Sequence, residues 1–348
     1  DNPETVVDHV RLFRNHPGLF WKYRVHEQIL PSLNRTGAKL LFSDVEIHHV
    51  GYIDPALRAR KQERDFRLLK MDFAENTNDP FILFNLAAIH QERNNHAEAL
   101  PFIKRSLELS APQDSIVRKL YAMMANCHRK MGQNKEAVDV CLAGRKLYPD
   151  DPEMLHVEAI ARDDSGDSAG AESCYRRLLD GRENGNYFAS VADGLRGHIS
   201  RHNLAVLLFK QKRYTEAEVQ WRMALTEEPE YLPAKMGLGE MYLERQNYTG
   251  MEQMVEQFGD RAEAAVLRGR ARLARKEYAA ARWELTQAIE SFPKHVGLHL
   301  ILSHALLQEG VDTVAAEQTL RTILELDPNH PNAKQNLEVL LRERQGKR

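Results

Sequence analysis

The residues best suited to chemistry lie near the start of the chain, where His26 and Glu27 follow Arg24 in the string RVHEQIL. On an extended strand alternate side chains share a face, so His26 is expected beside Arg24 and Gln28. A neutral imidazole is a good ligand for a divalent metal ion, whereas a histidine at a domain edge often serves only as a local hydrogen-bonding group. The sequence leaves both interpretations open.

His48 and His49 form a second candidate pair in the string IHHVGY. Adjacent residues of a strand face opposite ways, so the two imidazoles cannot both serve one site without a bulge. We retain His48 as a candidate contact of the same site as His26. No His-x3-His or Cys-x2-Cys spacing accompanies the pair, so a structural zinc is not expected. No cysteine or serine has a partner base that its spacing identifies, and an independent enzyme within this chain is the least favoured interpretation.

Three short strands are expected to position these histidines. Apolar residues alternate over Val10–Phe13, Tyr23–Ile29 and Val45–Tyr52, and turn-forming residues stand between them. Strands of this length cannot bury a core alone, so they must pack on the first helices or on sequence outside this chain. From Pro55 the apolar period becomes helical, which predicts a connecting helix over residues 55–78.

A recurring two-helix pattern fills the rest of the chain. One copy lies between Arg201 and Pro229, in which Ala205 and Ala217 are short enough to let two helices approach closely and Trp221 fills the space beside them. The small or soft residue that opens the second helix recurs as Ala99, Ala137, Ala171, Ala217, Met251, Ala281 and Ala316. A bulky or soft apolar residue follows four positions later each time. This periodicity predicts paired helices stacked in chain order.

The pattern resembles the tetratricopeptide repeat, whose period is about 34 residues and whose motif ends in A-x3-F and then Pro. The resemblance covers residues 79–344 and implies an all-α fold, an α-solenoid of about seven helical hairpins plus a capping helix. The expected divisions are 79–112, 113–149, 150–182, an insertion at 183–197, then 198–230, 231–260, 261–294, 295–328 and a cap at 329–344. Each repeat buries its apolar face on its neighbours, so such an array needs no single large core.

A second resemblance concerns about the first seventy residues. The strings RLFRN, RVHEQIL and IHHVGY, followed by RARKQERDFRLLK, are similar to the closing segment of the catalytic domain of family 2 glycosyltransferases, in bacterial members that carry a repeat array after that domain. The resemblance implies that residues 1–54 are a small α/β remnant of a GT-A-like domain. It also implies that Arg24, His26, Glu27 and His48 contact a metal, the donor diphosphate or the acceptor.

Under this resemblance the nucleotide-sugar and divalent-metal sites belong to a longer parent chain. The sequence begins at Asp1 without an initiator methionine, which agrees with a fragment of something longer. No cofactor is then expected in this fragment itself, and the fragment is expected to be inactive alone.

The inner face of the array is the other candidate site. Repeat arrays bind an extended segment or a helix of a partner along the concave surface formed by their first helices. The residues expected there are aromatic, amide and charged: Phe84, Asn85, Asn126, Arg129, His202, Asn203, Phe209 and Glu240. This set lacks the regular Lys and Asn arrangement with which chaperone-binding arrays hold a terminal carboxylate. We therefore expect a different protein or peptide, with a glycosyl acceptor as one candidate.

Composition restricts the partner classes. The 348-residue chain has a formal net charge of -2, which argues against a nucleic-acid binder driven by overall charge. It contains no uninterrupted apolar run of about 18 residues, so no membrane-spanning helix is expected. Cys127, Cys141 and Cys174 fall at core positions of predicted helices, so reduced thiols and a cytoplasmic location are expected.

Two functions fit these observations. In the first, the chain is the C-terminal portion of a repeat-bearing glycosyltransferase whose array recruits an acceptor or a partner protein. In the second, it is a stand-alone, non-catalytic scaffold for protein–protein interaction, and the segment before the array is an accessory cap. An Asp-x-Asp metal site encoded upstream of Asp1 would favour the first function.

Overall fold

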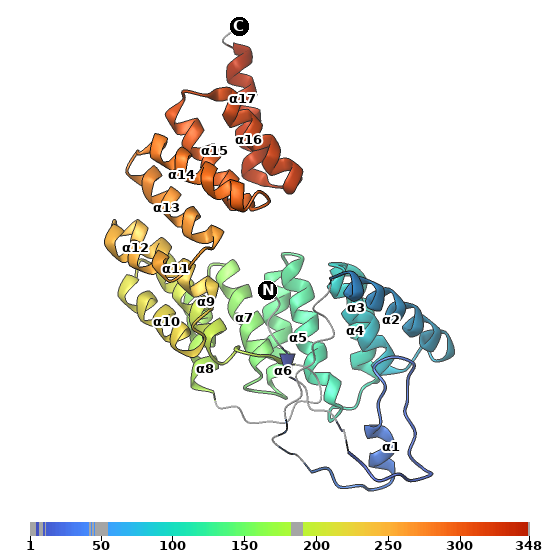
Figure 1. Cartoon of the computed structure of the whole chain (residues 1–348). Coiled ribbons are helices and arrows are strands. Elements are labelled where there is room, and N and C mark those ends of the chain that lie inside the picture. Colours follow the sequence, from blue (N-terminus) through green and yellow to red (C-terminus); the bar gives the residue numbers. More distant parts are fainter. Residues whose placement is uncertain are drawn as a thin grey trace. The chain divides into compact units, whose positions relative to one another are not determined.

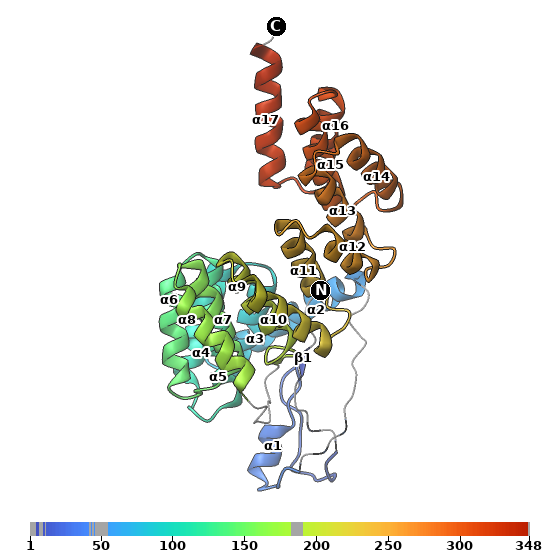
Figure 2. The same ribbon diagram turned by 90° about the vertical axis from the view of Figure 1, so that its left-hand side faces the viewer.

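The computed structural model of the chain describes residues 5–6, 10, 12–41, 43, 45, 55–181 and 191–346. The chain divides between Ser200 and Arg201, inside helix α9 (His198–Lys210), into a first and a second unit. Figures 1 and 2 show the helices of both units as ribbons. Both units are built from helical hairpins, so the all-α solenoid expected from the sequence is confirmed.

Helix α2 (Pro55–Glu75) opens the helical part of the first unit, and three hairpins follow it. They are α3 (Pro80–Glu92) with α4 (His96–Leu109), α5 (Ser115–Lys130) with α6 (Asn134–Arg145), and α7 (Pro152–Asp164) with α8 (Ser168–Asp180). The hairpins stack in chain order, because α4 packs on α5 and α6 packs on α7 (Figure 1). Helix α2 packs on α3 and so covers one end of the stack.

The second unit repeats this arrangement. It contains the larger part of α9 and the helices α10 (Tyr214–Glu227), α11 (Leu232–Glu244), α12 (Tyr248–Glu256), α13 (Ala262–Ala274), α14 (Tyr278–Ser291), α15 (Val296–Glu309), α16 (Thr313–Leu326) and α17 (Pro331–Gly346). Within this unit α10 packs on α11, α12 on α13 and α14 on α15. The unpaired helix α17 packs on α16, the position of the expected cap.

One turn geometry recurs between the two helices of six hairpins. Its central residue has a left-handed backbone in each case: Asn94, Gly132, Gly166, Lys212, Gln246 and Lys276. The next N–H closes the turn on the first helix, as in the bonds from Asn95 N to His90 O at 2.8 Å and from Arg213 N to Leu208 O at 2.9 Å. The turn is therefore the same whether or not its left-handed residue is a glycine.

The first helices of neighbouring hairpins contact one another. In the first unit α3 contacts α5 and α5 contacts α7, whereas the second helices α4, α6 and α8 make no comparable contacts with one another along residues 79–181. Helices that converge on one side and diverge on the other give a curved stack. We call the side of α3, α5 and α7 that α4, α6 and α8 leave uncovered the inner surface of the first unit.

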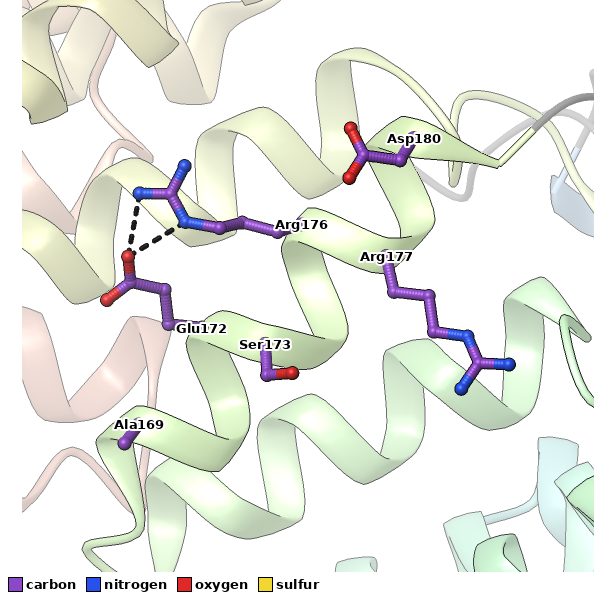
Figure 3. A pocket seen from close by; sticks show the side chains of 6 residues that line it. All are labelled: Ala169, Glu172, Ser173, Arg176, Arg177 and Asp180. Carbon is purple, nitrogen blue, oxygen red and sulfur yellow. Dashed lines mark hydrogen bonds and ion pairs between the residues drawn. The ribbon is translucent and has the colours of Figure 1, made fainter.

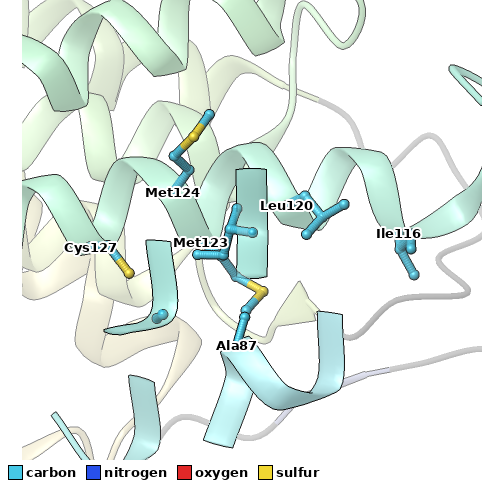
Figure 4. Packing of buried hydrophobic residues seen from close by; sticks show 8 residues of the cluster. Ala87, Ile116, Leu120, Met123, Met124 and Cys127 are labelled. Atoms are coloured by element: carbon cyan, nitrogen blue, oxygen red, sulfur yellow. The ribbon is translucent and has the colours of Figure 1, made fainter. Parts of the chain in front are cut away.

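Small and large side chains interlock in the core between hairpins (Figure 4). Ala87 of α3 packs with Leu120, Met123 and Cys127 of α5 in one buried cluster. The seven positions that the sequence predicts at helix crossings all have no exposed surface: Ala99, Ala137, Ala171, Ala217, Met251, Ala281 and Ala316. Six are alanines, whose short side chains let the helices approach closely.

Proline and aspartate start two first helices of the first unit. Asp79 precedes Pro80, and its Oδ1 accepts hydrogen bonds from Phe81 N at 3.0 Å and Ile82 N at 3.3 Å. Asp151 caps α7 in the same way, with a bond of 2.8 Å from Met154 N. These carboxylates satisfy N–H groups that a helix leaves without partners in its first turn.

The predicted α/β remnant does not form where the structure describes residues 1–54, and the predicted strands 10–13 and 23–29 are wrong. Residues 12–16 adopt no regular structure, and residues 23–26 form a bend closed by a bridge between Lys22 and Gln28. Tyr23 and His26 have φ angles of 73° and 56°, a left-handed conformation that interrupts a strand.

A short helix follows this bend. Helix α1 (Leu30–Arg35) occupies a segment in which no helix was expected. The third predicted strand, 45–52, falls outside the described residues except for Val45.

The bend instead packs on the first helices. Val25 is buried in a cluster with Leu69 of α2 and Ile82 and Leu86 of α3. Burial against α2 and α3 thus explains the apolar residues of the bend. Their spacing is similar to the alternation of a strand, which is why the sequence predicted a strand here. We call residues 22–29 the N-terminal clip.

Two very short strands form the β structure of the described residues. Strand β1 (Thr5–Val6) pairs antiparallel with β2 (Val191–Ala192), with Thr5 opposite Ala192. Strand β2 belongs to the insertion expected at 183–197, of which residues 183–190 lie outside the described residues.

Buried charges in the first unit are paired. Glu158 stands on α7 where an apolar residue is usual, and it is only 1% exposed. Arg145 of α6 and Arg162 of α7 both bind its carboxylate, the latter with a bond of 2.9 Å from Nε. These two guanidinium groups compensate the desolvation that a lone buried carboxylate would suffer.

The three cysteines are buried and free, as predicted. Burial raises the pKa of Cys174 to about 11, so this thiol is protonated at neutral pH. In the part of the chain that the structure describes, no helix has both the length and the apolar content needed to cross a bilayer.

Candidate functional site

An aromatic row begins the inner surface of the first unit. The ring of Phe84 is stacked on that of Phe81, with centroids 6.2 Å apart, and Phe81 lies 4.6 Å from the ring of Tyr23 in the N-terminal clip. All three side chains are half-buried, so each leaves part of its ring accessible. The sequence predicted Phe84 here but not Tyr23, because the bend that brings Tyr23 to α3 was not foreseen.

Asn126 and Arg129 continue the surface on α5. Both are half-buried, and Nη2 of Arg129 donates a hydrogen bond of 3.0 Å to Oδ1 of Asn126. They stand three residues apart, which places them on one face of the helix. The Asn126 NH2 group donates to none of the described residues, so it is available to a ligand carbonyl.

His156 on α7 is a third component that the sequence analysis missed. Its ring lies edge-on to Tyr175, with centroids 6.4 Å apart. Burial, and then the positive charge of Arg129, lowers the pKa of His156 to about 4, so the imidazole is neutral at pH 7. The register could have identified it, because His156 stands three residues before the buried Ala159 as Phe84 stands before Ala87.

Asn85 does not join this surface. It is 6% exposed, and its Nδ2 donates a hydrogen bond of 2.8 Å to the carbonyl oxygen of Phe81 within the same helix. The amide is therefore used inside α3.

In the second unit, His202 and Phe209 support packing. Nε1 of Trp221 donates a hydrogen bond of 3.1 Å to Nδ1 of His202, and burial lowers the pKa of His202 to about 4. The ring of Phe209 lies 5.9 Å from that of Trp221. Both residues thus fix α9 on α10, and Asn203 between them in the sequence is half-buried.

Glu240 already has a partner in the second unit. Arg270 of α13 forms an ion pair with the Glu240 carboxylate of α11. Burial raises the pKa of Glu240, against the opposing effect of Arg270. The pair links two neighbouring first helices, so neither charge is left for a ligand without breaking it.

Two segments of the chain match known sequence families. Residues 199–226 and residues 266–331 each match a family model described as a tetratricopeptide repeat. This chain contains tetratricopeptide repeats. No curated protein matches the sequence.

Three solved structures resemble the chain in fold. A tetratricopeptide repeat protein from Parabacteroides merdae superposes with a TM-score of 0.57 at 14% identity, over 75% of this chain and 98% of that chain. Yeast Tom70 gives 0.59 at 13% identity, over 88% and 67%. PilW, a type IV pilus biogenesis factor, gives 0.51 at 15% identity, over 64% and 98%. At these identities the likeness shows the fold alone.

The glycosyltransferase resemblance finds no support in these comparisons. The family matches fall within the tetratricopeptide repeats, and the described part of residues 1–54 lacks the α/β fold that the resemblance implies.

The candidate contacts before the tetratricopeptide repeats do not assemble a site. Arg24 forms salt bridges with Glu75 and Asp72 of α2, which raise its pKa. His26 and Glu27 are exposed, and His26 belongs to a bend instead of a strand, so the predicted shared face with Arg24 is wrong. His48 lies outside the described residues. Across the described ranges, no group of three His, Cys, Asp or Glu residues is placed to hold a metal ion.

A shallow hollow on α8 offers less than the inner surface (Figure 3). It is lined by one face of that helix: Ala169, Glu172, Ser173, Arg176, Arg177 and Asp180. Arg176 pairs with Glu172 at 2.7 Å and Arg177 with Asp150 at 2.8 Å. Its arginines are thus already matched by carboxylates of the first unit.

The string GDSAG at residues 166–170 has the spacing of a nucleophile elbow, which the sequence analysis overlooked. In the structure it is a turn between two helices, where Oδ1 of Asp167 accepts a bond of 2.9 Å from Gly170 N. Ser168 is the first residue of α8 and follows no strand. The spacing here belongs to a helix cap.

Proposed function

We propose that this chain is a protein-binding scaffold that holds an extended segment of a partner polypeptide on the inner surface of its first unit. The observation that carries the proposal is an accessible aromatic ring on α3 followed by an unused amide on α5, at Phe84 and Asn126. The contacts of α3 with α5 and of α5 with α7 support it, because they line up the first helices of this unit side by side.

The spacing between neighbouring first helices favours an extended segment over a helix as the ligand. Packed helices stand about 8–10 Å apart, a distance that about three residues of extended chain span. A partner strand crossing α3, α5 and α7 would then present one side chain or backbone group to each helix in turn. Recognition of this kind uses the backbone for affinity and individual side chains for specificity.

Each residue of the surface has a distinct expected role. Phe84, backed by Phe81 and Tyr23, receives an apolar side chain of the partner. The Asn126 NH2 group donates to a backbone carbonyl, which would otherwise lose its bond to water on binding. The neutral ring of His156 lies one helix further on.

The test is selection of a random library of short peptides on the immobilised full chain, followed by calorimetry of the selected peptides. Phe84→Ala and Asn126→Ala are expected to weaken binding by about tenfold each, because interface aromatic and amide contacts are worth about 1–2 kcal/mol. Leu142→Ala, at an exposed apolar position on α6, is the matched control and is expected to leave affinity unchanged.

Two results would refute the proposal. One is that no peptide is selected. The other is that selected peptides lose affinity with Leu142→Ala and keep it with both inner-surface variants.

The proposal does not rest on glycosyl transfer. The parent enzyme, its sugar donor and its metal have no supporting observation among the described residues, where Arg24 is paired with Glu75 and Asp72. The proposed scaffold function depends on the inner surface alone.

A further inference from the structure

The N-terminal clip lies on two buried carboxylates, that of Asp72 near the end of α2 and that of Asp79 at the start of α3. Oδ2 of Asp72 accepts a hydrogen bond of 3.1 Å from the backbone N–H of Arg24, whose guanidinium also binds this carboxylate. Oδ2 of Asp79 accepts a hydrogen bond of 2.8 Å from Nζ of Lys22. Two cations of the clip are therefore paired with two carboxylates that stand at the ends of different helices.

The rest of this contact is apolar and aromatic. Val25 is buried with Leu69 of α2 and Ile82 of α3, and the ring of Tyr23 lies 4.6 Å from that of Phe81. We call the surface that receives the clip the clip seat; it comprises Leu69, Asp72, Asp79, Phe81 and Ile82. Four consecutive residues of the clip fill it, in the order cation, aromatic residue, cation and small apolar residue.

The backbone of the docked clip is strained. Tyr23 has a φ of 73° and His26 a φ of 56°, a region that is unfavourable for residues with a Cβ atom. His26 is exposed, so no burial of its own side chain offsets the strain. Strain of this kind recurs in ligand clamps and switch segments, where surrounding contacts maintain it. The seat therefore holds the clip less tightly than it would hold the same side chains on a relaxed backbone.

The ionic contacts of the clip are open to water on one side. The side chains of Lys22 and Arg24 are 51% and 35% exposed, and ion pairs of exposed cations contribute little net stability. Emptying the seat is nevertheless unfavourable, because Asp72 and Asp79 would lose their cationic partners. These two conditions favour the exchange of one cationic segment for another over simple release of the clip.

We propose that the clip seat is a binding site for a basic and aromatic segment of a partner polypeptide, and that the clip is an internal ligand which this segment displaces. The segment presents a lysine or arginine, an aromatic residue, an arginine and a small apolar residue in that order. Because atoms of the clip reach both carboxylates, a segment that takes the place of the clip reaches them too. The inference goes beyond the proposed function, because this site is formed by α2 and the start of α3 and binds cations.

The probe is an amidated peptide of the clip sequence, FWKYRVHEQI, with an N-terminal fluorophore, and anisotropy measures its binding to the full chain. The double variant Arg24→Ala/Val25→Ser weakens the clip and leaves the seat unchanged. We expect this clip-weakened chain to bind the peptide about tenfold more tightly than the unmodified chain, because apparent affinity rises with the fraction of open seats. The peptide with His26→Gly is expected to bind about threefold more tightly still, because glycine adopts the left-handed conformation without strain.

Two further substitutions test the seat in the clip-weakened chain. Asp72→Asn and Asp79→Asn keep the side-chain shape and remove the charge, and asparagine also caps helices. Each is expected to weaken peptide binding about tenfold, the factor typical of one charge-assisted contact. Asp312→Asn, at the carboxylate that caps α16, is the matched control and is expected to leave the affinity unchanged. Asn126→Ala is expected to leave it unchanged as well, which separates this site from the inner surface.

Circular dichroism identifies which variants are folded. Equal affinity of the peptide for the unmodified and clip-weakened chains would overturn the inference, as would the absence of binding to both. Binding that survives in the folded Asp72→Asn and Asp79→Asn variants would also overturn it, and so would a loss in Asn126→Ala alone, which would place the peptide on the inner surface. A concentration-dependent dimer of the unmodified chain that Asp72→Asn abolishes would assign the seat to the clip of a second copy and exclude the partner segment.

Discussion

The phenolic oxygen of Tyr23 donates a hydrogen bond of 3.1 Å to Oδ1 of Asp79, the atom that also caps α3. Nζ of Lys22 binds the other oxygen of the same carboxylate at 2.8 Å. One buried carboxylate thus begins the first hairpin and holds the N-terminal clip against it. This relationship joins the clip, the aromatic row and the inner surface, because Tyr23 also packs on Phe81.

Removing that carboxylate is expected to release the clip and loosen the start of α3. For Asp79→Ala we predict a loss of about 2 kcal/mol in the opening free energy of this region, the sum of a helix cap and a buried hydrogen bond. Native-state hydrogen exchange at the amides of Phe81 and Ile82 measures it. Asp312→Ala is the control, because Asp312 caps α16 through Ala315 N alone, and a local loss of about 1 kcal/mol is expected there. An equal effect of the two substitutions would contradict the double role of Asp79.

The buried carboxylate of Glu158 is expected to be critical for stability. Glu158→Ala leaves the Arg145 and Arg162 guanidinium groups near α7 without this counter-charge, and we predict a loss of about 3 kcal/mol in the free energy of unfolding. Urea denaturation followed by circular dichroism measures the change. Glu172→Ala removes the partner of the more exposed Arg176 and is expected to cost less than about 0.5 kcal/mol. Similar losses for the two variants would show that the Glu158 pairs are not special.

The left-handed turn position predicts opposite effects for two substitutions. Lys212 has a φ of 60°, so Lys212→Gly is expected to raise the free energy of unfolding by about 0.5–1 kcal/mol, because glycine adopts this conformation without strain. Gly132 has a φ of 75°, so Gly132→Ala is expected to lower the free energy of unfolding by about 1 kcal/mol. The control is Lys210→Gly at the end of α9, where glycine weakens a helix. Thermal melts of the three variants decide the matter, and a stabilising Gly132→Ala would exclude this explanation.

The lowered pKa of His202 leads us to predict that the free energy of unfolding falls as the pH is lowered. Its folded-state pKa is about 4, below the unfolded value of about 6.5, so the unfolded chain binds the extra proton first. The contribution of the neutral ring is fully present above about pH 6.5 and is lost as the pH falls towards 4. We expect His202→Gln, which keeps an acceptor for Trp221, to reduce the slope of unfolding free energy against pH in this window. An unchanged slope would mean that His202 titrates normally in the folded chain.

The repeats could be predicted because the close approach of two helices favours a small residue at their crossing. Six of the seven crossing positions, Ala217 among them, are alanine, and this requirement depends only on neighbours within one hairpin. The burial of the Glu158 carboxylate could not be predicted, because its partner Arg145 belongs to the preceding hairpin. The repeat register also identified Asn126 and Arg129 as inner-surface candidates, though not the hydrogen bond between them.

The N-terminal segment shows why alternation misleads. Val25 and Ile29 are buried, and their spacing is the same as that of two residues on one face of a strand. The left-handed φ angles of Tyr23 and His26 interrupt the strand, and neither residue type predicts them from the sequence. Likewise, His202 resembles an exposed polar residue in the sequence, because the sequence does not show that Trp221 donates a hydrogen bond to its ring.

The central claim is that the inner surface of the first unit binds a polypeptide, and photo-crosslinking tests it most directly. The photoreactive residue benzoylphenylalanine replaces Phe84 in one full-length variant and the exposed Leu142 of α6 in another, and each is irradiated with a peptide selected by the unmodified chain. We predict a crosslinked product with the first variant, reduced by excess unlabelled peptide, and none above background with the second. Crosslinking at position 142 without crosslinking at position 84 would contradict the account.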